Sequence, residues 1–250
     1  MAGSRVHFII LLLSCPVFAL TESMSMHYEK GLDAYLNNQY ELAIQEFETL
    51  LDNNWASREL YYNLGNAYYR NGNISGSVWA YESCLSLSPT HADAGYNLEL
   101  ANLKVKDRVD LPDPPIYLKW YMGIKENYTP STWINITLFI LFLLSILVTA
   151  SRILPAVSLH YIPGIFITLL FCSLFFTLHS IWTGSSVNQG IIYDPVVEAR
   201  SEPNTFSAQL FEIHEGLKVS VNQISDNWME IELLDGKAGW IEKHQIRLIQ

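Results

Sequence analysis

The chain has few cysteines for its length of 250 residues. The three that it has, Cys15, Cys84 and Cys172, lie in three different kinds of segment. None has a plausible disulfide partner, and none stands at metal-ligand spacing from another cysteine or from a histidine. The sequence therefore predicts neither a disulfide framework nor a metal site, because isolated cysteines of this kind are usually small packing residues.

Basic residues are also scarce. Lysine and arginine number 15 against 25 aspartate and glutamate residues, which gives a formal net charge of −10. No segment gathers the basic residues into a stripe that could follow a phosphate backbone. Nucleic acid is therefore excluded as an expected partner.

The short motifs of common catalytic sites are absent from the sequence. It contains no HExxH, GxSxG, CxxC or phosphate-binding loop pattern, and its histidines fall in different predicted elements or compartments. We therefore expect that the protein is not an enzyme, that it uses no cofactor, and that it has no catalytic residues.

Long apolar runs are what the chain has in abundance. Residues 133–150 and 161–182 contain no aspartate, glutamate, lysine or arginine. Each run is long enough to cross about 30 Å of hydrocarbon at about 1.5 Å per helical residue. The sequence predicts transmembrane helices at 131–150 and 161–183 with a short loop at 151–160. The alternative, two buried core helices, requires more covering sequence than the rest of the chain offers.

The first 20 residues have the pattern of a secretory signal peptide. Arg5 precedes a short apolar core, and Ala19 stands at a suitable cleavage site. The sequence around Cys15 also resembles a lipoprotein cleavage box, so ordinary cleavage and lipidation of Cys15 both stay open. A cleaved signal sends the following domain across the membrane, and two further crossings return the C-terminal part to that same side.

Residues 24–91 repeat themselves. Five pairs of similar residues stand 34 positions apart: Gly31 and Gly65, Tyr35 and Tyr69, Ile44 and Val78, Phe47 and Tyr81, Leu51 and Leu85. This period is typical of the tetratricopeptide repeat, a helix–turn–helix unit that buries its apolar face by stacking on a neighbour. The run YNLGNAYYRNG at 62–72 resembles the core pattern of that family. The sequence thus predicts an all-α domain over 24–107, with two repeats and a capping helix.

The resemblance implies a concave groove that binds segments of other proteins. The residues that would face this groove are Tyr62, Asn63, Asn66, Tyr69, Arg70 and Asn97. Asparagine amides in such a groove can pair with the backbone of an extended ligand. The alternative is that these residues occupy positions that every repeat needs for stacking.

The part of the chain after the repeats divides into a linker, the predicted hairpin and a β-domain. Residues 108–130 hold a Pro-rich spacer, and from residue 191 onward apolar and polar residues alternate between turn signals. This pattern predicts five short strands, at 196–200, 210–216 with 218–221, 228–233, 238–241 and 246–249. We therefore expect a small all-β barrel over 191–250.

This C-terminal segment resembles a bacterial SH3-like domain. The residues that carry the resemblance are Val197, Arg200, Pro203, Leu210, Gly216, Val219, Trp228, Asp235, Gly236, Gly239, Trp240 and Ile241. Such domains bind peptides or cell-wall material in some proteins and only brace a neighbouring domain in others. Trp228 and Trp240 are the candidates for a ligand face, and both also suit a place in the core or at its rim.

The order of all these parts resembles the BatE type of aerotolerance-operon protein. The resemblance implies a multidomain protein of the bacterial inner membrane whose soluble domains both face the periplasm. It also implies protein partners, among them membrane proteins with von Willebrand A domains and a MoxR-type ATPase system. The expected function is that of a membrane-anchored adaptor, and the alternative is peptidoglycan recognition through the SH3-like domain.

Overall fold

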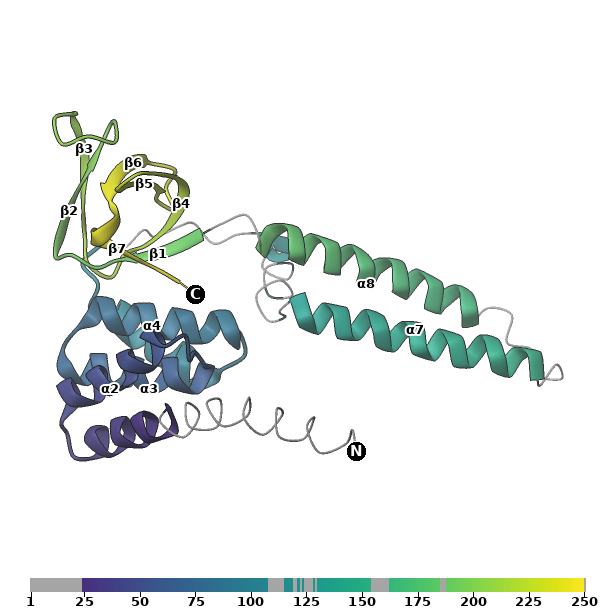
Figure 1. Ribbon diagram of the computed structural model, residues 1–250. Helices are drawn as coiled ribbons and strands as arrows, with labels where there is room; N and C mark the ends of the chain where they lie inside the picture. Colours follow the sequence, from purple (N-terminus) through teal and green to yellow (C-terminus); the bar gives the residue numbers. More distant parts are fainter. Residues whose placement is uncertain are drawn as a thin grey trace, which may run out of the picture.

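The computed structural model describes residues 24–107, 115–118, 121, 123, 128, 130–153, 162–184 and 188–249. These residues form a helical N-terminal domain, a pair of long helices and a C-terminal antiparallel sheet (Figure 1). The predicted signal peptide, residues 1–20, lies outside the described residues, as does most of the predicted linker.

The N-terminal domain is built from helices joined by short turns. In order these are the helix at 24–36, α2 (Tyr40–Asp52), α3 (Arg58–Asn71), α4 (Ile74–Leu87) and α5 (Ala92–Asn102). The side chain of Ser57 caps α3 by accepting a hydrogen bond from the backbone N–H of Leu60, and Gly72, at a φ of 86°, ends the helix. The predicted helical domain is confirmed, while its tetratricopeptide identity stays a prediction.

The sequence repeat is also a packing repeat. Gly31 lies against the ring of Phe47, where an added Cβ would stand 2.4 Å from the nearest ring carbon. At the equivalent place in the second helix pair, Gly65 lies against Tyr81, and an added Cβ would stand 2.6 Å from that ring. A missing side chain therefore lets the two helices of each pair approach closely at the same place.

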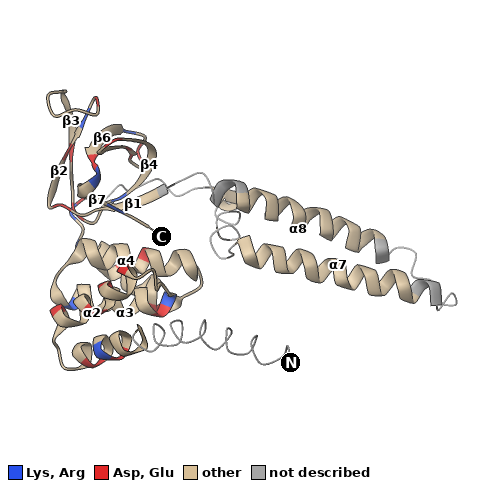
Figure 2. Ribbon diagram, viewed as in Figure 1, with Lys and Arg blue, Asp and Glu red and all other residues tan. Residues whose placement is uncertain are grey.

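The helices α7 (Pro130–Ile153) and α8 (Ile162–Gly184) form an antiparallel pair. Both are long and apolar enough to cross a membrane, and only 6% and 11% of their apolar windows are buried. Helix α7 has no Asp, Glu, Lys or Arg between residues 130 and 150, and α8 has none between residues 164 and 181 (Figure 2). Thr137 and Thr177 meet at the contact between the helices, with their hydroxyl oxygens 3.1 Å apart. Helix α7 continues through residues 151–153, the first residues of the predicted loop.

The C-terminal domain is one antiparallel sheet in the strand order β3-β2-β6-β5-β4-β1-β7. Its strands are β1 (Asn188–Ile192), β2 (Val196–Arg200), β3 (Gln209–His214), β4 (Lys218–Ser225), β5 (Trp228–Glu232), β6 (Ala238–Glu242) and β7 (Ile246–Leu248). Alternate residues of β5 and β6 point into the core, as the burial of Met229, Ile231 and Ile241 shows. The remaining residues of these strands form an outward face.

The sequence pattern predicts fewer strands than the sheet contains. The pattern predicts one strand over 210–216 with 218–221. In the structure, a turn at Gly216, where φ is +84°, divides this segment into β3 and β4. Strand β1 was not predicted, because a short segment with a glycine and no polar–apolar alternation gives little periodic signal. Gly190 in β1 lies against the side chain of Ile246 in β7, which leaves no room for a larger residue.

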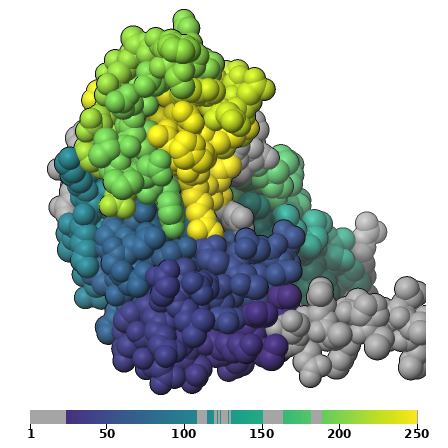
Figure 3. Space-filling model, turned by 60° about the vertical axis from the view of Figure 1, so that its left-hand side comes forward, coloured from purple at the N-terminus to yellow at the C-terminus, as the bar shows by residue number. Residues whose placement is uncertain are grey.

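The sheet domain packs directly on the helical domain, on the side formed by α4. Figure 3 shows the green and yellow C-terminal domain seated on the blue helices without a gap. Ile191 of β1 is fully buried and belongs to the same apolar cluster as Phe47, Leu64 and Trp79. The helical domain and the sheet domain therefore share a hydrophobic core.

Candidate functional site

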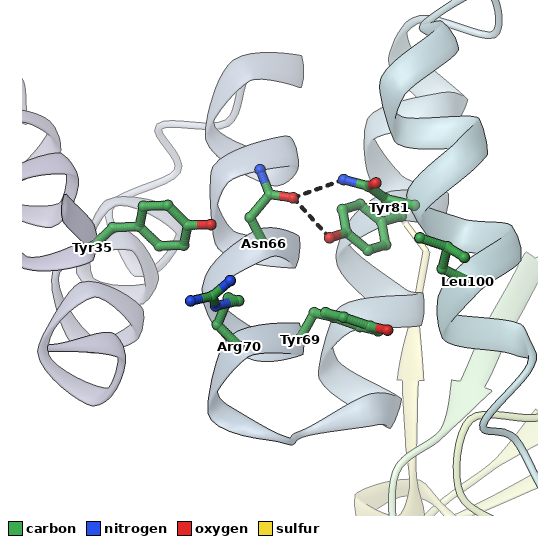
Figure 4. A pocket seen from close by; sticks show the side chains of 7 residues that line it. Tyr35, Asn66, Tyr69, Arg70, Tyr81 and Leu100 are labelled. Atoms are coloured by element: carbon green, nitrogen blue, oxygen red, sulfur yellow. Dashed lines mark hydrogen bonds between the residues drawn. The ribbon is translucent and has the colours of Figure 1, made fainter. Parts of the chain in front are cut away.

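A cavity of about 200 Å³ opens on the helical domain, between the first helix and α5. It is lined by Tyr35, Asn66, Tyr69, Arg70, Tyr81, Asn97 and Leu100 (Figure 4). Helix α3 supplies three of these residues from successive turns of one face, since positions three and four apart lie side by side on a helix. The lining therefore combines aromatic, amide and guanidinium groups from four helices.

A hydrogen-bond network fixes the amide groups of this cavity. The side-chain oxygen of Asn66 accepts hydrogen bonds from the Tyr81 hydroxyl, at 2.8 Å, and from the Asn97 amide nitrogen, at 3.0 Å (Figure 4). Within the described residues, the Asn66 amide nitrogen and the Asn97 amide oxygen have no hydrogen-bond partner. One donor and one acceptor thus stay available, which is the complement of a peptide group.

Two cations stand at the rim of the cavity. Arg70 is exposed and donates hydrogen bonds to the Tyr40 hydroxyl, at 2.8 and 3.2 Å. The ammonium group of Lys104 lies 4.0 Å from the ring centroid of Tyr69, a cation–π contact. Neither cation has a carboxylate within salt-bridge distance in the described part of the chain, whereas Arg58 at the other end of α3 pairs with Glu59 at 2.6 Å.

The hydroxyls of Tyr35 and Tyr81 in the lining stay protonated around neutral pH. Burial raises the pKa of Tyr81 well above its ordinary value, although the hydrogen bond from the amide of Asn97 opposes this. Burial also raises the pKa of Tyr35, against the opposing charge of Arg70. The lining contains no carboxylate, histidine or cysteine. Its chemistry is that of hydrogen-bond donors, hydrogen-bond acceptors and a fixed positive charge.

Four of the six predicted groove residues line this cavity, and two lie elsewhere. The amide of Asn63 donates a hydrogen bond of 2.8 Å to the hydroxyl of Tyr28 and thereby links the two repeats. The ring of Tyr62 packs on His91, with the ring centroids 4.9 Å apart. Both residues lie nearer the start of α3 than the cavity does.

Sequence reasoning did not include Tyr35, Tyr81 and Leu100 among the groove residues. Tyr35 could have been found, because it stands 34 positions before Tyr69 in the repeat. The ring of Tyr81 fills the space between α3 and α4, where it packs against Gly65. Its hydroxyl nevertheless reaches the cavity, so the Tyr81 side chain both packs between the helices and lines the cavity.

The outward face of the sheet forms a second candidate site. Trp228 and Trp240 are half-buried on this face, where Trp228 lies opposite Glu242 and Trp240 lies opposite Glu230. A cavity of about 260 Å³ here is lined by Val196, Glu198, Arg200, Trp228, Glu242 and Gln245. Trp240 is not part of that lining.

Within the described residues, no group of three or more histidine, cysteine, aspartate or glutamate side chains could hold a metal ion.

Comparison with known proteins identifies the C-terminal domain. The sequence model of the family described as Bacterial SH3 domain matches residues 194–247. The match extends from just before β2 into β7, and it confirms the predicted SH3-like domain. Strand β1 precedes the matched residues and is nevertheless paired with β4 and β7 in the same sheet. Among curated proteins, none matches this chain.

Proposed function

We propose that this chain is a membrane-anchored adaptor that captures a segment of a partner protein in the cavity of its helical domain. The observation that carries the proposal is the half-satisfied amide pair of Asn66 and Asn97, which stands beside the guanidinium of Arg70. An extended peptide can use the free amide nitrogen and oxygen through its own backbone, as in other modes of peptide recognition. The aromatic rings of Tyr35 and Tyr69 supply apolar contact area at the same place.

The helical domain belongs, in this proposal, to the tetratricopeptide repeats. The support is the 34-residue period together with the equivalent packing of Gly31 on Phe47 and of Gly65 on Tyr81. Repeats of this kind expose a concave surface formed by the first helix of each pair, and α3 is such a helix. The adaptor role follows from that surface and requires no reaction. The absence of carboxylate, histidine and cysteine from the cavity lining agrees with a binding role.

The proposed location is the bacterial inner membrane, with both soluble domains in the periplasm. The apolar pair α7 and α8 supplies the anchor, and the Bacterial SH3 domain match fits an envelope protein. The signal-peptide pattern of residues 1–20 supplies the orientation. By the resemblance to the BatE type, we propose that the partners are membrane proteins with von Willebrand A domains and a MoxR-type ATPase system.

Photo-crosslinking from the cavity tests this function. A photoreactive amino acid at Leu100, in the full chain in its native membrane, should crosslink to a protein with a von Willebrand A domain. We expect Arg70→Ser to lower the yield about tenfold, which corresponds to about 1.4 kcal/mol of binding energy. The matched control is Arg58→Ser, which removes a guanidinium from the other end of α3, outside the cavity lining. Equal yields from Arg70→Ser and from the unsubstituted chain would show that the cavity is not the binding site.

A second candidate function is recognition of peptidoglycan by the SH3-like domain. The observations that favour it are the family match and the cavity beside Trp228 on the outward face of the sheet. The full chain in detergent should then sediment with purified peptidoglycan, and Trp228→Ala should remove it from the pellet. Sedimentation that is unaffected by this substitution would contradict binding at that cavity.

A further inference from the structure

The outer side of α4 is covered by the C-terminal domain. Trp79, in the middle of the helix, is 1% exposed, and its indole N–H donates a hydrogen bond of 2.8 Å to the backbone carbonyl of Leu248. The guanidinium carbon of Arg247 lies 3.4 Å from the centroid of the Trp79 ring. The buried residues of α4 are Ser75, Gly76, Ser77, Val78, Trp79, Ala80, Tyr81, Ser83 and Cys84. A helix that is buried on every side requires a neighbour on every side.

Arg247 also reaches past α4 to the other helices. Its two terminal nitrogens donate to the two carboxylate oxygens of Glu48 on α2, at 2.9 and 2.7 Å. The hydroxyl of Tyr68 on α3 donates to the same carboxylate at 2.5 Å. Such a bidentate pair has one preferred geometry, so it specifies how β7 lies on the helices. Burial lowers the pKa of Arg247, but its contacts with Glu48 and Tyr68 more than reverse this, and the side chain stays charged.

Contacts elsewhere along the interface agree with this arrangement. Lys218 of β4 donates to Glu82 of α4 at 2.7 Å. The backbone N–H of His214 in β3 donates to the carboxylate of Asp107 at 2.6 Å. Gly216 lies so close to Val105 that an added Cβ would stand 2.8 Å from its side chain. These contacts lie at separate places, so together they fix both the position and the rotation of the sheet domain.

The chain reaches this interface from both ends of the membrane hairpin. Asp107 is the last described residue of the helical domain, and β1 begins at Asn188. Ile191 and Ile249 both pack in the apolar cluster of the helices. A bilayer core is about 30 Å thick, so none of these contacts could form if the two domains faced opposite sides of a membrane.

We infer that residues 24–107 and 188–249 form a single composite folding unit into which the α7–α8 hairpin is inserted, with both parts on one side of the membrane. The partner of the outer face of α4 is the chain's own C-terminal strand, held by the contact of Arg247 with Glu48 and Trp79. The inference rests on the contacts between the domains and does not depend on a ligand in the groove.

Carbodiimide crosslinking of the full, unsubstituted chain in membranes tests the contact between the domains. This reagent joins a carboxylate to an amine only where the two groups touch. We expect an amide bond between Lys218 and Glu82, identified by mass spectrometry and lost in Lys218→Gln. The internal control is Lys237 with Asp235, which lie 2.8 Å apart within the sheet domain. Formation of the control bond without the bond between Lys218 and Glu82 would overturn the inference.

A charge exchange tests the specific pair. In the full chain, Glu48→Arg and Arg247→Glu should each lower the hydrogen-exchange protection of the α4 amides at least tenfold. The double variant, with the charges exchanged, should recover most of that protection, while the control Lys237→Glu should leave it unchanged.

Reporter fusions at the C-terminus and at residue 24 should lie in the same compartment. Unchanged protection in both single variants, or reporters in opposite compartments, would refute the composite unit.

Discussion

Gly65 shows how a single residue sets the distance between two helices. An added Cβ would stand 2.6 Å from the ring of Tyr81. This ring cannot move away, because it is buried and its hydroxyl donates a hydrogen bond to the side chain of Asn66. We expect Gly65→Ala to destabilise the protein by about 1–3 kcal/mol through overpacking. Urea unfolding of the full chain in detergent, followed by circular dichroism, measures this.

Gly95 in α5 provides the matched control for that substitution. It is a helical glycine with nothing within 4 Å of an added Cβ. Gly95→Ala should stabilise the protein by up to about 1 kcal/mol, because alanine is the better helix former. Equal effects at the two glycines would contradict the close approach of α3 and α4.

Cys84 gives a prediction for alkaline pH. Burial raises the pKa of its thiol from 9.0 to about 11. The protonated thiol therefore contributes its full stability below pH 9, and this contribution is lost as the pH rises from 9 to 11, where only the unfolded chain gives up the proton. Over that range, the free energy of unfolding should fall more steeply for the unsubstituted chain than for Cys84→Ala, by up to about 1.4 kcal/mol per pH unit. Parallel curves would show that Cys84 already titrates normally in the folded protein.

At the scale of one element, the start of α3 depends on its cap. The hydroxyl oxygen of Ser57 accepts a hydrogen bond of 3.1 Å from the backbone N–H of Leu60. We expect Ser57→Ala to cost about 1 kcal/mol in thermal or urea unfolding. Gln39 holds the same position before α2 but makes no side-chain capping bond, so Gln39→Ala should be close to neutral. A similar loss at both positions would argue against the capping bond as the cause.

The two neighbouring helices α3 and α4 show what the sequence could predict. Helix α3 could be placed from the repeat, since Gly65 and Gly72 stand where a close approach and a helix end require glycine. For α4, the repeat predicts a second helix in the pair but not the covering of its outer side. The signal was present, because Glu82 is the only charged residue between Ile74 and Leu87. A surface helix usually carries several charged residues on its exposed side, whereas α4 carries one.

At the scale of the whole molecule, the cavity was partly predictable and the interface was not. Asn66, Tyr69 and Arg70 follow from the position of α3 in a repeat, because the period assigns each residue to a face. Glu48 and Arg247 stand 199 positions apart in the sequence, and no repeat period relates them. Contacts of this kind depend on how complete domains fit together. A local pattern can indicate that a side of a helix is covered, as it does for α4, but it does not indicate which segment covers it.

The ion pairs of Arg247 with Glu48 and of Lys218 with Glu82 both join the two domains, and their geometry predicts unequal importance. The guanidinium of Arg247 makes a bidentate contact with Glu48 and stacks on Trp79, while Lys218 makes one contact with Glu82 at the edge. Arg247→Met should therefore cost about 2–3 kcal/mol, because it leaves the Glu48 carboxylate without its cation in a partly buried place. Lys218→Met should cost less than Arg247→Met, because this pair makes a single contact without stacking and the Lys218 side chain is more exposed than that of Arg247.

The double variant Glu48→Met with Arg247→Met separates the ion pair from the packing of the side chains. If the loss in Arg247→Met comes mainly from the stranded carboxylate, removing that carboxylate as well should restore about half or more of the stability. Urea unfolding of the four chains in detergent gives the coupling energy directly. Strictly additive losses would instead mean that Arg247 acts through its contact with Trp79. The domains would then be held together by the aromatic contact and the shared apolar core, with the charge of Glu48 playing little part.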